Sequence, residues 1–149
     1  MVRVALTSLL LLLAACGPRH TMAPPPGFVR FEQQKAMAFI TADGVRLKSR
    51  EVDNYPKGDL PFWTDALKRH LVARGYVLKA ETCFRTLKQL DGCRLDFVLP
   101  HGAEDWILSE TVFVVGDRIA LVEAAGPYAR FVAIEAGLGK ALATFEPGG

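Results

Sequence analysis

Strand-like runs joined by very short glycine turns constrain the fold of this chain more than any other feature. Two such units are present, residues 35–42 with 45–52 and residues 106–115 with 118–125. Asp43-Gly44 joins the first pair and Gly116-Asp117 joins the second. An Asp-Gly link favours a type I′ hairpin, which needs a positive φ at both positions. Since hairpins pair neighbouring strands antiparallel, these turns predict a mostly antiparallel sheet.

Two amphipathic helices are predicted beside the strands. The first follows Asp59, a good N-cap, carries Pro61 in its first turn and ends at Gly75. The second is predicted over residues 128–145, because apolar residues recur there at helical spacing. Pro127 is well placed at its start. The predicted order is hairpin, helix, four-strand meander, helix. This order predicts an α+β sandwich in which two helices pack on the sheet.

The two strands predicted on either side of residues 88–92 each carry a cysteine. If Cys83 lies opposite Cys93, a disulfide would clamp this hairpin. A tighter turn at Asp91-Gly92 would instead place Cys93 beside Leu90, and the sequence leaves both pairings open. A zinc site is not indicated, because two thiols without a clustered pair of histidines supply too few ligands.

An apolar N-terminal run ends in Leu13-Ala14-Ala15-Cys16, and Arg3 precedes it. The run is about half as long as a membrane-spanning helix, so it is typical of a signal peptide. It resembles the lipobox of bacterial lipoproteins. The resemblance implies that residues 1–15 are removed and that Cys16 becomes the first residue, carrying diacylglyceryl and palmitate chains. The alternative is an ordinary secretory signal, cut elsewhere, in which Cys16 is incidental.

The lipoprotein resemblance also implies a location in the cell envelope, with the lipid bilayer as partner through Cys16. Gly17 stands where an Asp commonly retains lipoproteins on the inner membrane, which favours the outer membrane, facing the periplasm. Residues 16–27 are predicted to form a tether, because their three consecutive prolines prefer an extended, solvated backbone. Residues 28–145 then form a single domain. In this oxidising compartment a disulfide would persist.

The element order resembles the PsbP-like α/β/α fold. The likeness rests on the first hairpin, on the helix that carries Phe62-Trp63 and ends in Gly75-Tyr76, and on the ending from Asp117 to Phe145. This group includes a photosystem II extrinsic subunit and several bacterial envelope lipoproteins, and its members mostly bind other proteins or support assemblies. The resemblance implies a non-enzymatic module with an envelope protein as partner, and it carries no catalytic centre to this chain.

No catalytic or cofactor motif accompanies these features. His20, His70 and His101 lack the close spacing of metal ligands, and neither a Walker loop nor a Gly-x-Ser-x-Gly elbow occurs. The 18 basic and 16 acidic residues nearly balance, and the basic ones are scattered. Nucleic-acid binding is not expected, since it needs a concentrated basic face. The sequence predicts no enzyme, no cofactor and no metal site.

Polar residues in the predicted strands have a simple and a functional interpretation. One predicted strand carries a basic residue at every second position, Arg46, Lys48 and Arg50, and these form a basic strip. The simple interpretation is a solvated strand face. The functional alternative is a contact for acidic partners or anionic lipid headgroups. Glu110 and Glu123 lie in otherwise apolar strands. Alternation can place both carboxylates in solvent, and the functional alternative is a polar-lined groove.

The leading functional prediction is a protein-binding or assembly-support lipoprotein. The alternative is a lipoprotein that binds a small ligand in a pocket between sheet and helix, lined by Trp63, Trp106 and Tyr128. Such pockets are mostly apolar with a few placed polar groups. For Trp63, a place in the hydrophobic core is the simpler interpretation.

Overall fold

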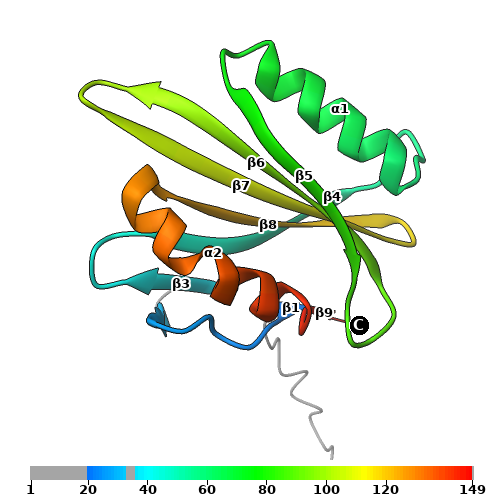
Figure 1. The fold of residues 1–149 in the computed structure, drawn as a ribbon. Coiled ribbons are helices and arrows are strands. Elements are labelled where there is room, and N and C mark those ends of the chain that lie inside the picture. Colours follow the sequence, from blue (N-terminus) through cyan, green and yellow to red (C-terminus); the bar gives the residue numbers. More distant parts are fainter. Residues whose placement is uncertain (1–19, 33–35, 149) are drawn as a thin grey trace, which may run out of the picture.

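A computed structural model of the chain describes residues 20–32 and 36–148; the predicted signal peptide 1–15 and Cys16 lie outside the described residues. The main sheet contains β2 (Phe28–Arg30), β3 (Ala38–Thr41), β4 (Arg46–Asp53), β5 (Val77–Arg85), β6 (Asp91–His101), β7 (Glu104–Val115) and β8 (Arg118–Pro127). Its strands follow the order β2-β3-β4-β8-β7-β6-β5, and every pairing is antiparallel (Figure 1). A short ribbon pairs β1 (His20–Thr21) with β9 (Glu146–Pro147).

Two helices, α1 (Leu60–Val72) and α2 (Tyr128–Leu142), lie on opposite faces of this sheet (Figure 1). Helix α1 contacts β5, β6 and β7, whereas α2 contacts β7 and β8. The carboxylate of Asp59 accepts a hydrogen bond from the backbone N–H of Phe62 at 2.9 Å, so Asp59 caps α1 as predicted. Gly75 adopts a φ of 90°, which glycine allows without strain, and the chain turns there into β5. The predicted α+β class, with a mostly antiparallel sheet and two helices, is confirmed.

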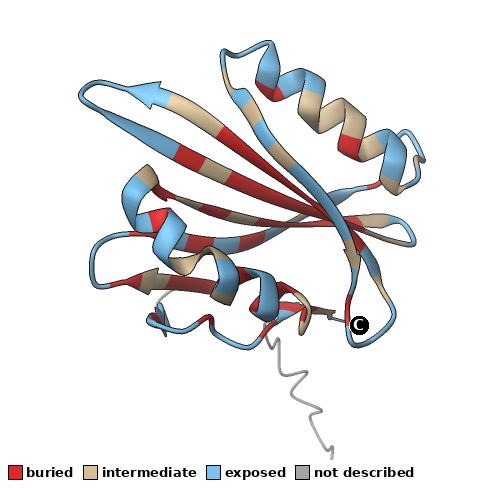
Figure 2. Cartoon of the chain, viewed as in Figure 1, coloured by how far each residue is buried: buried red, intermediate tan, exposed pale blue. Residues whose placement is uncertain are grey.

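The larger hydrophobic core lies between α2 and the sheet. Phe113 from β7, Phe131 from α2 and Phe145 beyond α2 are all fully buried in it. A smaller core lies under α1, where Leu71 packs with Phe97. Buried residues therefore run along the central strands, while the outer side of each helix is exposed (Figure 2).

Residues 20–27 lie against the domain and do not form the solvated tether predicted for residues 16–27. The side chain of His20 is buried, and its Nε2 lies 3.2 Å from Oε2 of Glu51. Met22 is buried in the α2-side core. The prolines do favour an extended backbone, but an extended segment can also pair as a strand and bury apolar side chains. Composition alone did not distinguish these two outcomes, and residues 16–19 lie outside the described residues.

The first hairpin forms as predicted, but through a different turn. The backbone N–H of Gly44 donates to the carbonyl of Thr41 at 3.1 Å, and that of Thr41 donates to the carbonyl of Val45 at 3.0 Å. Gly44 has a φ of 94°, whereas Asp43 is not among the residues with positive φ. This pattern matches a three-residue loop that ends in a left-handed glycine, not a type I′ turn.

Cys83 and Cys93 lie directly opposite each other in the β5–β6 pair, and their sulfur atoms are 1.96 Å apart in a disulfide. The hairpin bends between Thr86 and Leu90, where the N–H of Thr86 donates to the carbonyl of Leu90 at 2.9 Å. The chain therefore adopts the register that brings the cysteines together, and not the tighter turn at Asp91-Gly92.

Removing this disulfide with the double substitution Cys83→Ser and Cys93→Ser is expected to lower the free energy of unfolding by about 2–4 kcal/mol. The bridge closes a loop of the unfolded chain and so reduces its conformational entropy. Urea unfolding of oxidised protein, reduced protein and the double variant measures the effect, and intact mass reports whether the bridge is present. Equal unfolding midpoints for bridged and reduced protein would contradict the prediction.

Candidate binding site on the uncovered sheet face

Helix α1 covers only part of its own sheet face. It lies over β5, β6 and β7, and within the described ranges no helix lies over the same side of β3 and β4 (Figure 1). Alternation along the strands identifies the side chains on this side. We call this surface the open face; its residues are Ile40, Arg46, Lys48, Arg50, Val52, Trp106, Glu110 and Glu123.

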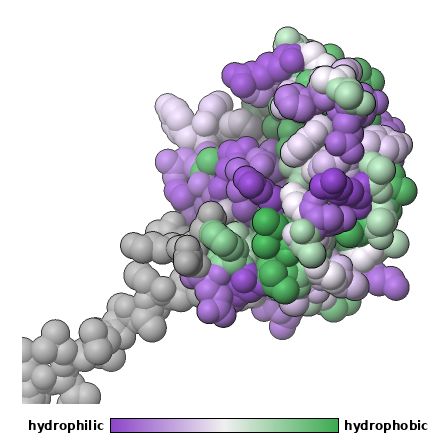
Figure 3. All heavy atoms as spheres, turned by 90° about the vertical axis from the view of Figure 1, so that its left-hand side faces the viewer, coloured by the Kyte–Doolittle hydropathy of each residue, from purple (hydrophilic) through white to green (hydrophobic). Residues whose placement is uncertain are grey.

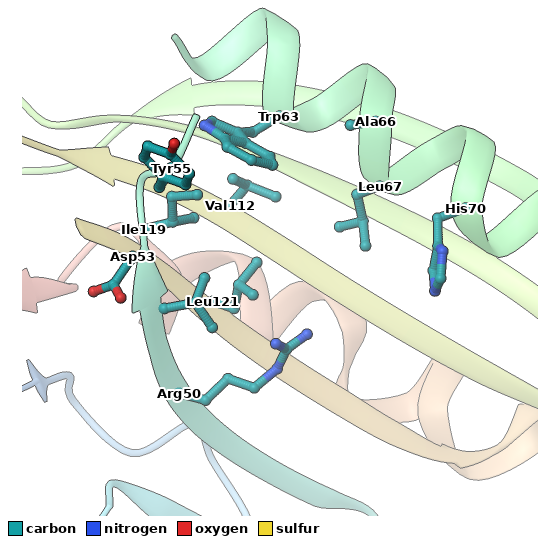
Figure 4. Close-up of a pocket in the computed structure, with 11 residues that line it drawn as sticks. Arg50, Asp53, Tyr55, Trp63, Ala66, Leu67, His70, Val112, Ile119 and Leu121 are labelled. Atoms are coloured by element: carbon teal, nitrogen blue, oxygen red, sulfur yellow. The ribbon is translucent and has the colours of Figure 1, made fainter. Parts of the chain in front are cut away.

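A cleft of about 460 Å³ lies between α1 and β4 (Figure 4). Trp63 and Leu67 project into it from α1, and Ile119 and Leu121 of β8 form its floor. At the end away from Trp63, Arg50 of β4 and His70 of α1 both approach the cleft (Figure 4). Its volume and its mostly apolar lining are typical of small-molecule sites.

A second groove, of about 720 Å³, follows β3 and β4 on the open face. Phe31 and Ile40 contribute apolar surface on one side and Trp106 on the other, with Lys48 and Glu123 also in its lining. The view from the left-hand side of Figure 1 shows hydrophilic residues interspersed with a compact hydrophobic group (Figure 3). No broad apolar field covers that view, so the two grooves are the better candidates for binding.

The predicted basic strip on β4 forms, but acidic residues compensate it. Nζ of Lys48 lies 3.1 Å from Oε1 of Glu123 on β8, and a guanidinium nitrogen of Arg50 lies 3.7 Å from Oε1 of Glu110 on β7. The pairing of β4 with β8 aligns Lys48 with Glu123, and the pairing of β8 with β7 places Glu110 next to Glu123 and near Arg50. The strip is therefore half of a mixed-charge cluster and not an isolated basic surface.

Glu110 departs from the simple interpretation of a solvated carboxylate, because only 3% of its surface is exposed. It is the direct cross-strand neighbour of Glu123. Burial, reinforced by the nearby Glu123 carboxylate, raises the pKa of Glu110 to about 7, although Arg50 and Lys48 oppose the shift. Its Oε2 has no hydrogen-bond partner among the described residues. This face therefore holds a carboxyl group that changes charge near neutral pH.

Replacing Glu110 with Gln is expected to flatten the pH dependence of stability. The folded protein keeps the Glu110 proton up to about pH 7, whereas the ordinary pKa of a solvated Glu carboxyl is 4.5. The folded state binds more protons between these values, so the free energy of unfolding falls as the pH rises through this window. The stabilisation that depends on the Glu110 proton is lost above about pH 7, and it amounts to at most about 3 kcal/mol of the free energy of unfolding.

Urea unfolding between about pH 5 and pH 8 measures this slope. Glu104→Gln, at an exposed carboxylate that begins β7, is the matched control and should retain the wild-type profile. A Glu110→Gln profile as steep as that of the wild type would refute the role of this carboxyl group.

The three aromatic residues predicted to line one pocket are not brought together. Trp63 lines the α1 cleft and Trp106 lines the second groove. Tyr128 begins α2 and packs against the core on the opposite side of the sheet. The error arose because apolar spacing identifies helices and strands but not the face of the sheet on which each one lies.

A buried ionic network on the α2 side was not predicted from the sequence. Nε of Arg94 donates to Oδ1 of Asp96 at 2.8 Å and to Oγ of Ser109 at 3.0 Å. A guanidinium nitrogen of Arg94 also lies 3.5 Å from Oε1 of Glu135, which ties α2 to the sheet. The opposite charges two residues apart in an otherwise apolar strand were the available signal, since such residues share a face.

The histidines occupy separate parts of the fold: His20 in β1, His70 in α1 and His101 at the end of β6. Within residues 20–32 and 36–148, no three His, Cys, Asp or Glu side chains gather closely enough to hold a metal ion. In the same part of the chain, neither helix has the length and apolar character needed to span a bilayer.

Comparison with solved structures identifies a PsbP-like fold. The cyanobacterial PsbP (CyanoP) of Synechocystis sp. PCC 6803 matches with a TM-score of 0.60 and 12% identity, over 87% of this chain and 86% of that chain. LpqN, involved in cell envelope biogenesis of Mycobacterium tuberculosis, matches with a TM-score of 0.64 and 8% identity. The match covers 87% of this chain and 83% of that chain.

A protein of unknown function from Pseudomonas aeruginosa matches with a TM-score of 0.51 and 15% identity, over 86% of this chain and 81% of that chain. No protein-family model and no curated protein matches the sequence. The PsbP-like α+β fold predicted from the element order is thus confirmed. At these identities the likeness concerns the fold alone.

Proposed function

We propose that this chain is a lipid-anchored envelope protein that binds a partner protein, without catalysis, through the open face. The observation that carries the proposal is a sheet surface that no helix covers in the described ranges. It holds a groove and a mixed-charge cluster, and the cleft beside α1 borders it. The lipobox resemblance at Cys16 supports the anchor. The envelope role in the description of LpqN supports the location, as a likeness between folds.

The docked N-terminal segment gives the proposed anchor a short reach. His20 is already paired with β9, and it lies only four positions after Cys16 in the sequence. An extended chain spans at most about 3.6 Å per residue, so acylated Cys16 would lie within about 14 Å of His20. Met22 packs on the α2 side, which leaves the open face free of this segment. The domain would therefore lie close to the bilayer with its binding surface accessible.

Site-specific photocrosslinking in the native envelope tests the binding surface. A photoreactive residue at Arg46, on the open face, is expected to capture a discrete protein partner. The same residue at Val132, exposed on the outer side of α2, serves as the control. Identical products at both positions, or lipid adducts alone, would count against the proposal. Intact mass of the membrane-extracted protein reports acylation at Cys16, and Cys16→Ala should abolish it.

Small-ligand binding is a second candidate function, and the cleft between α1 and β4 is the observation that favours it. This cleft, unlike the predicted pocket, involves neither Trp106 nor Tyr128. A ligand there would lie between a helix and the sheet, as the sequence-based alternative expected.

A further inference from the structure

Apolar side chains line the cleft beside α1 along most of its length. Leu67 of α1 faces Ile119 and Leu121 of β8, and Val112 of β7 completes the floor (Figure 4). The floor residues are buried, so the cleft has a firm base in the sheet. The walls are less buried, since Leu67 is partly exposed and Val52 of β4 is 37% exposed. An apolar chain laid between these walls would remove hydrocarbon surface from water, which favours binding.

One end of the cleft is cationic. The guanidinium of Arg50 is about half exposed, and its ion-pair partner among the described residues is Glu110, at 3.7 Å. That distance is longer than a hydrogen bond, so the guanidinium donors lack a close acceptor there. His70 offers a ring nitrogen across the cleft from Arg50 (Figure 4). An anionic group between these side chains would accept a charge-assisted hydrogen bond from Arg50 and a hydrogen bond from a ring N–H of His70.

We propose that this cleft binds a single-chain amphiphile with an anionic headgroup. Its chain lies along Leu67, Ile119 and Leu121, and its headgroup lies between Arg50 and His70. This inference rests on the small-ligand candidate above and names the chemistry of that ligand. A neutral or cationic amphiphile would gain the same apolar contacts but not the interaction with Arg50.

Glu110 modulates this site, because its carboxylate competes with the headgroup for Arg50. The charged and titratable groups that face Glu110 are Glu123 from β8 and Arg50 and Lys48 from β4, with His70 lining the cleft from α1. On the β6 side its cross-strand neighbour is the apolar Leu95. When Glu110 is ionised, Arg50 is partly neutralised; when Glu110 is protonated, the guanidinium charge is available to the ligand.

Photoaffinity labelling of the purified full-length protein in uncharged detergent tests the proposal. The probe is decanesulfonate with a diazirine near the end of its chain, since a sulfonate remains anionic throughout the pH range used. Labels are expected in the peptides that contain residues 60–72 and 118–127. Unlabelled decanesulfonate should compete more strongly than decanol or decyltrimethylammonium. Labels spread evenly over the chain, or equal competition by all three compounds, would overturn the inference.

Variants separate the headgroup site from general hydrophobic binding. Arg50→Gln is expected to weaken decanesulfonate binding about tenfold, the size of one charge-assisted hydrogen bond. Lys140→Gln, at an exposed position of α2 on the opposite face of the sheet, is the control and should bind as the wild type does. Ala66→Phe is expected to block the cleft, and its urea midpoint shows whether it folds. Equal losses in Arg50→Gln and Lys140→Gln would overturn the inference.

Glu110→Gln provides a gain of binding that a purely apolar cleft would not show. At about pH 8 it should bind decanesulfonate roughly threefold or more tightly than the wild type, because it removes a competing charge. At about pH 5.5 the two proteins should bind alike, since Glu110 is then protonated. An unchanged affinity at the higher pH overturns the role of Glu110. If the cleft stays unlabelled while the Arg46 crosslinker captures a protein, the ligand inference fails and the protein-binding function stands.

Discussion

Replacing Phe113 with Ala is expected to lower the free energy of unfolding by about 3–5 kcal/mol. Phe113 is fully buried, stacks on Phe145 with ring centroids 4.3 Å apart, and meets the edge of Phe84 at 5.9 Å. Its ring thus joins β7 to β5 and to the segment that follows α2. Truncation removes apolar burial and leaves a cavity between elements that cannot close on each other easily.

Gly92 supplies a second variant that tests this packing. A Cβ atom at Gly92 would lie 2.4 Å from the Phe113 ring, so Gly92→Ala alone is expected to destabilise the protein. In the Phe113→Ala background the same methyl group enters vacated space, and the two effects should not add. Urea unfolding of all four proteins measures the coupling free energy, with Val132→Ala as the exposed control. Additive losses would mean that the ring and Gly92 do not meet.

Local signals in the sequence predicted the helices and the hairpins, but they did not predict which distant strands pair in the sheet. Asp59 and Gly75 limit α1 through capping and a left-handed turn, both of which act within a few residues. Hairpin turns predict only neighbours along the chain. The pairing of β4 with β8, which aligns Lys48 with Glu123, joins strands separated by a helix and three other strands. No short pattern contains that information.

The candidate site depends on this long-range pairing, which explains why it was only partly predicted. The basic strip and the two acidic residues were recognised separately, each as a feature of its own strand. Their meeting at Arg50 and Glu110 requires the order β4-β8-β7. Burial then changes the chemistry, because a carboxylate that alternation assigned to solvent becomes a group that titrates near neutral pH. The sequence supplied the residue types, and the topology determined their environment.

Replacing Arg94 with Met is expected to lower the free energy of unfolding by about 3–5 kcal/mol. Arg94 and Asp96 are both buried, and Asp96 would lose its charged partner while its carboxylate stays out of water. Methionine retains much of the apolar volume, so the loss reports mainly the unpaired charge. The link from Arg94 to Glu135 is also lost, which should loosen α2. Urea unfolding measures the total, and hydrogen exchange of α2 amides measures the local effect.

The double variant Arg94→Met with Asp96→Leu separates the cost of an orphaned charge from the value of the pair. It should recover most of the stability lost in Arg94→Met, because a buried ion pair and apolar residues of similar size are often nearly equivalent. Arg69→Ala breaks the exposed pair with Asp65 and is the matched control, expected to change the free energy by less than about 1 kcal/mol. If Arg94→Met proves as mild as Arg69→Ala, the network does not hold α2 on the sheet. If the double variant is no more stable than Arg94→Met, the loss comes from packing and not from the unpaired carboxylate.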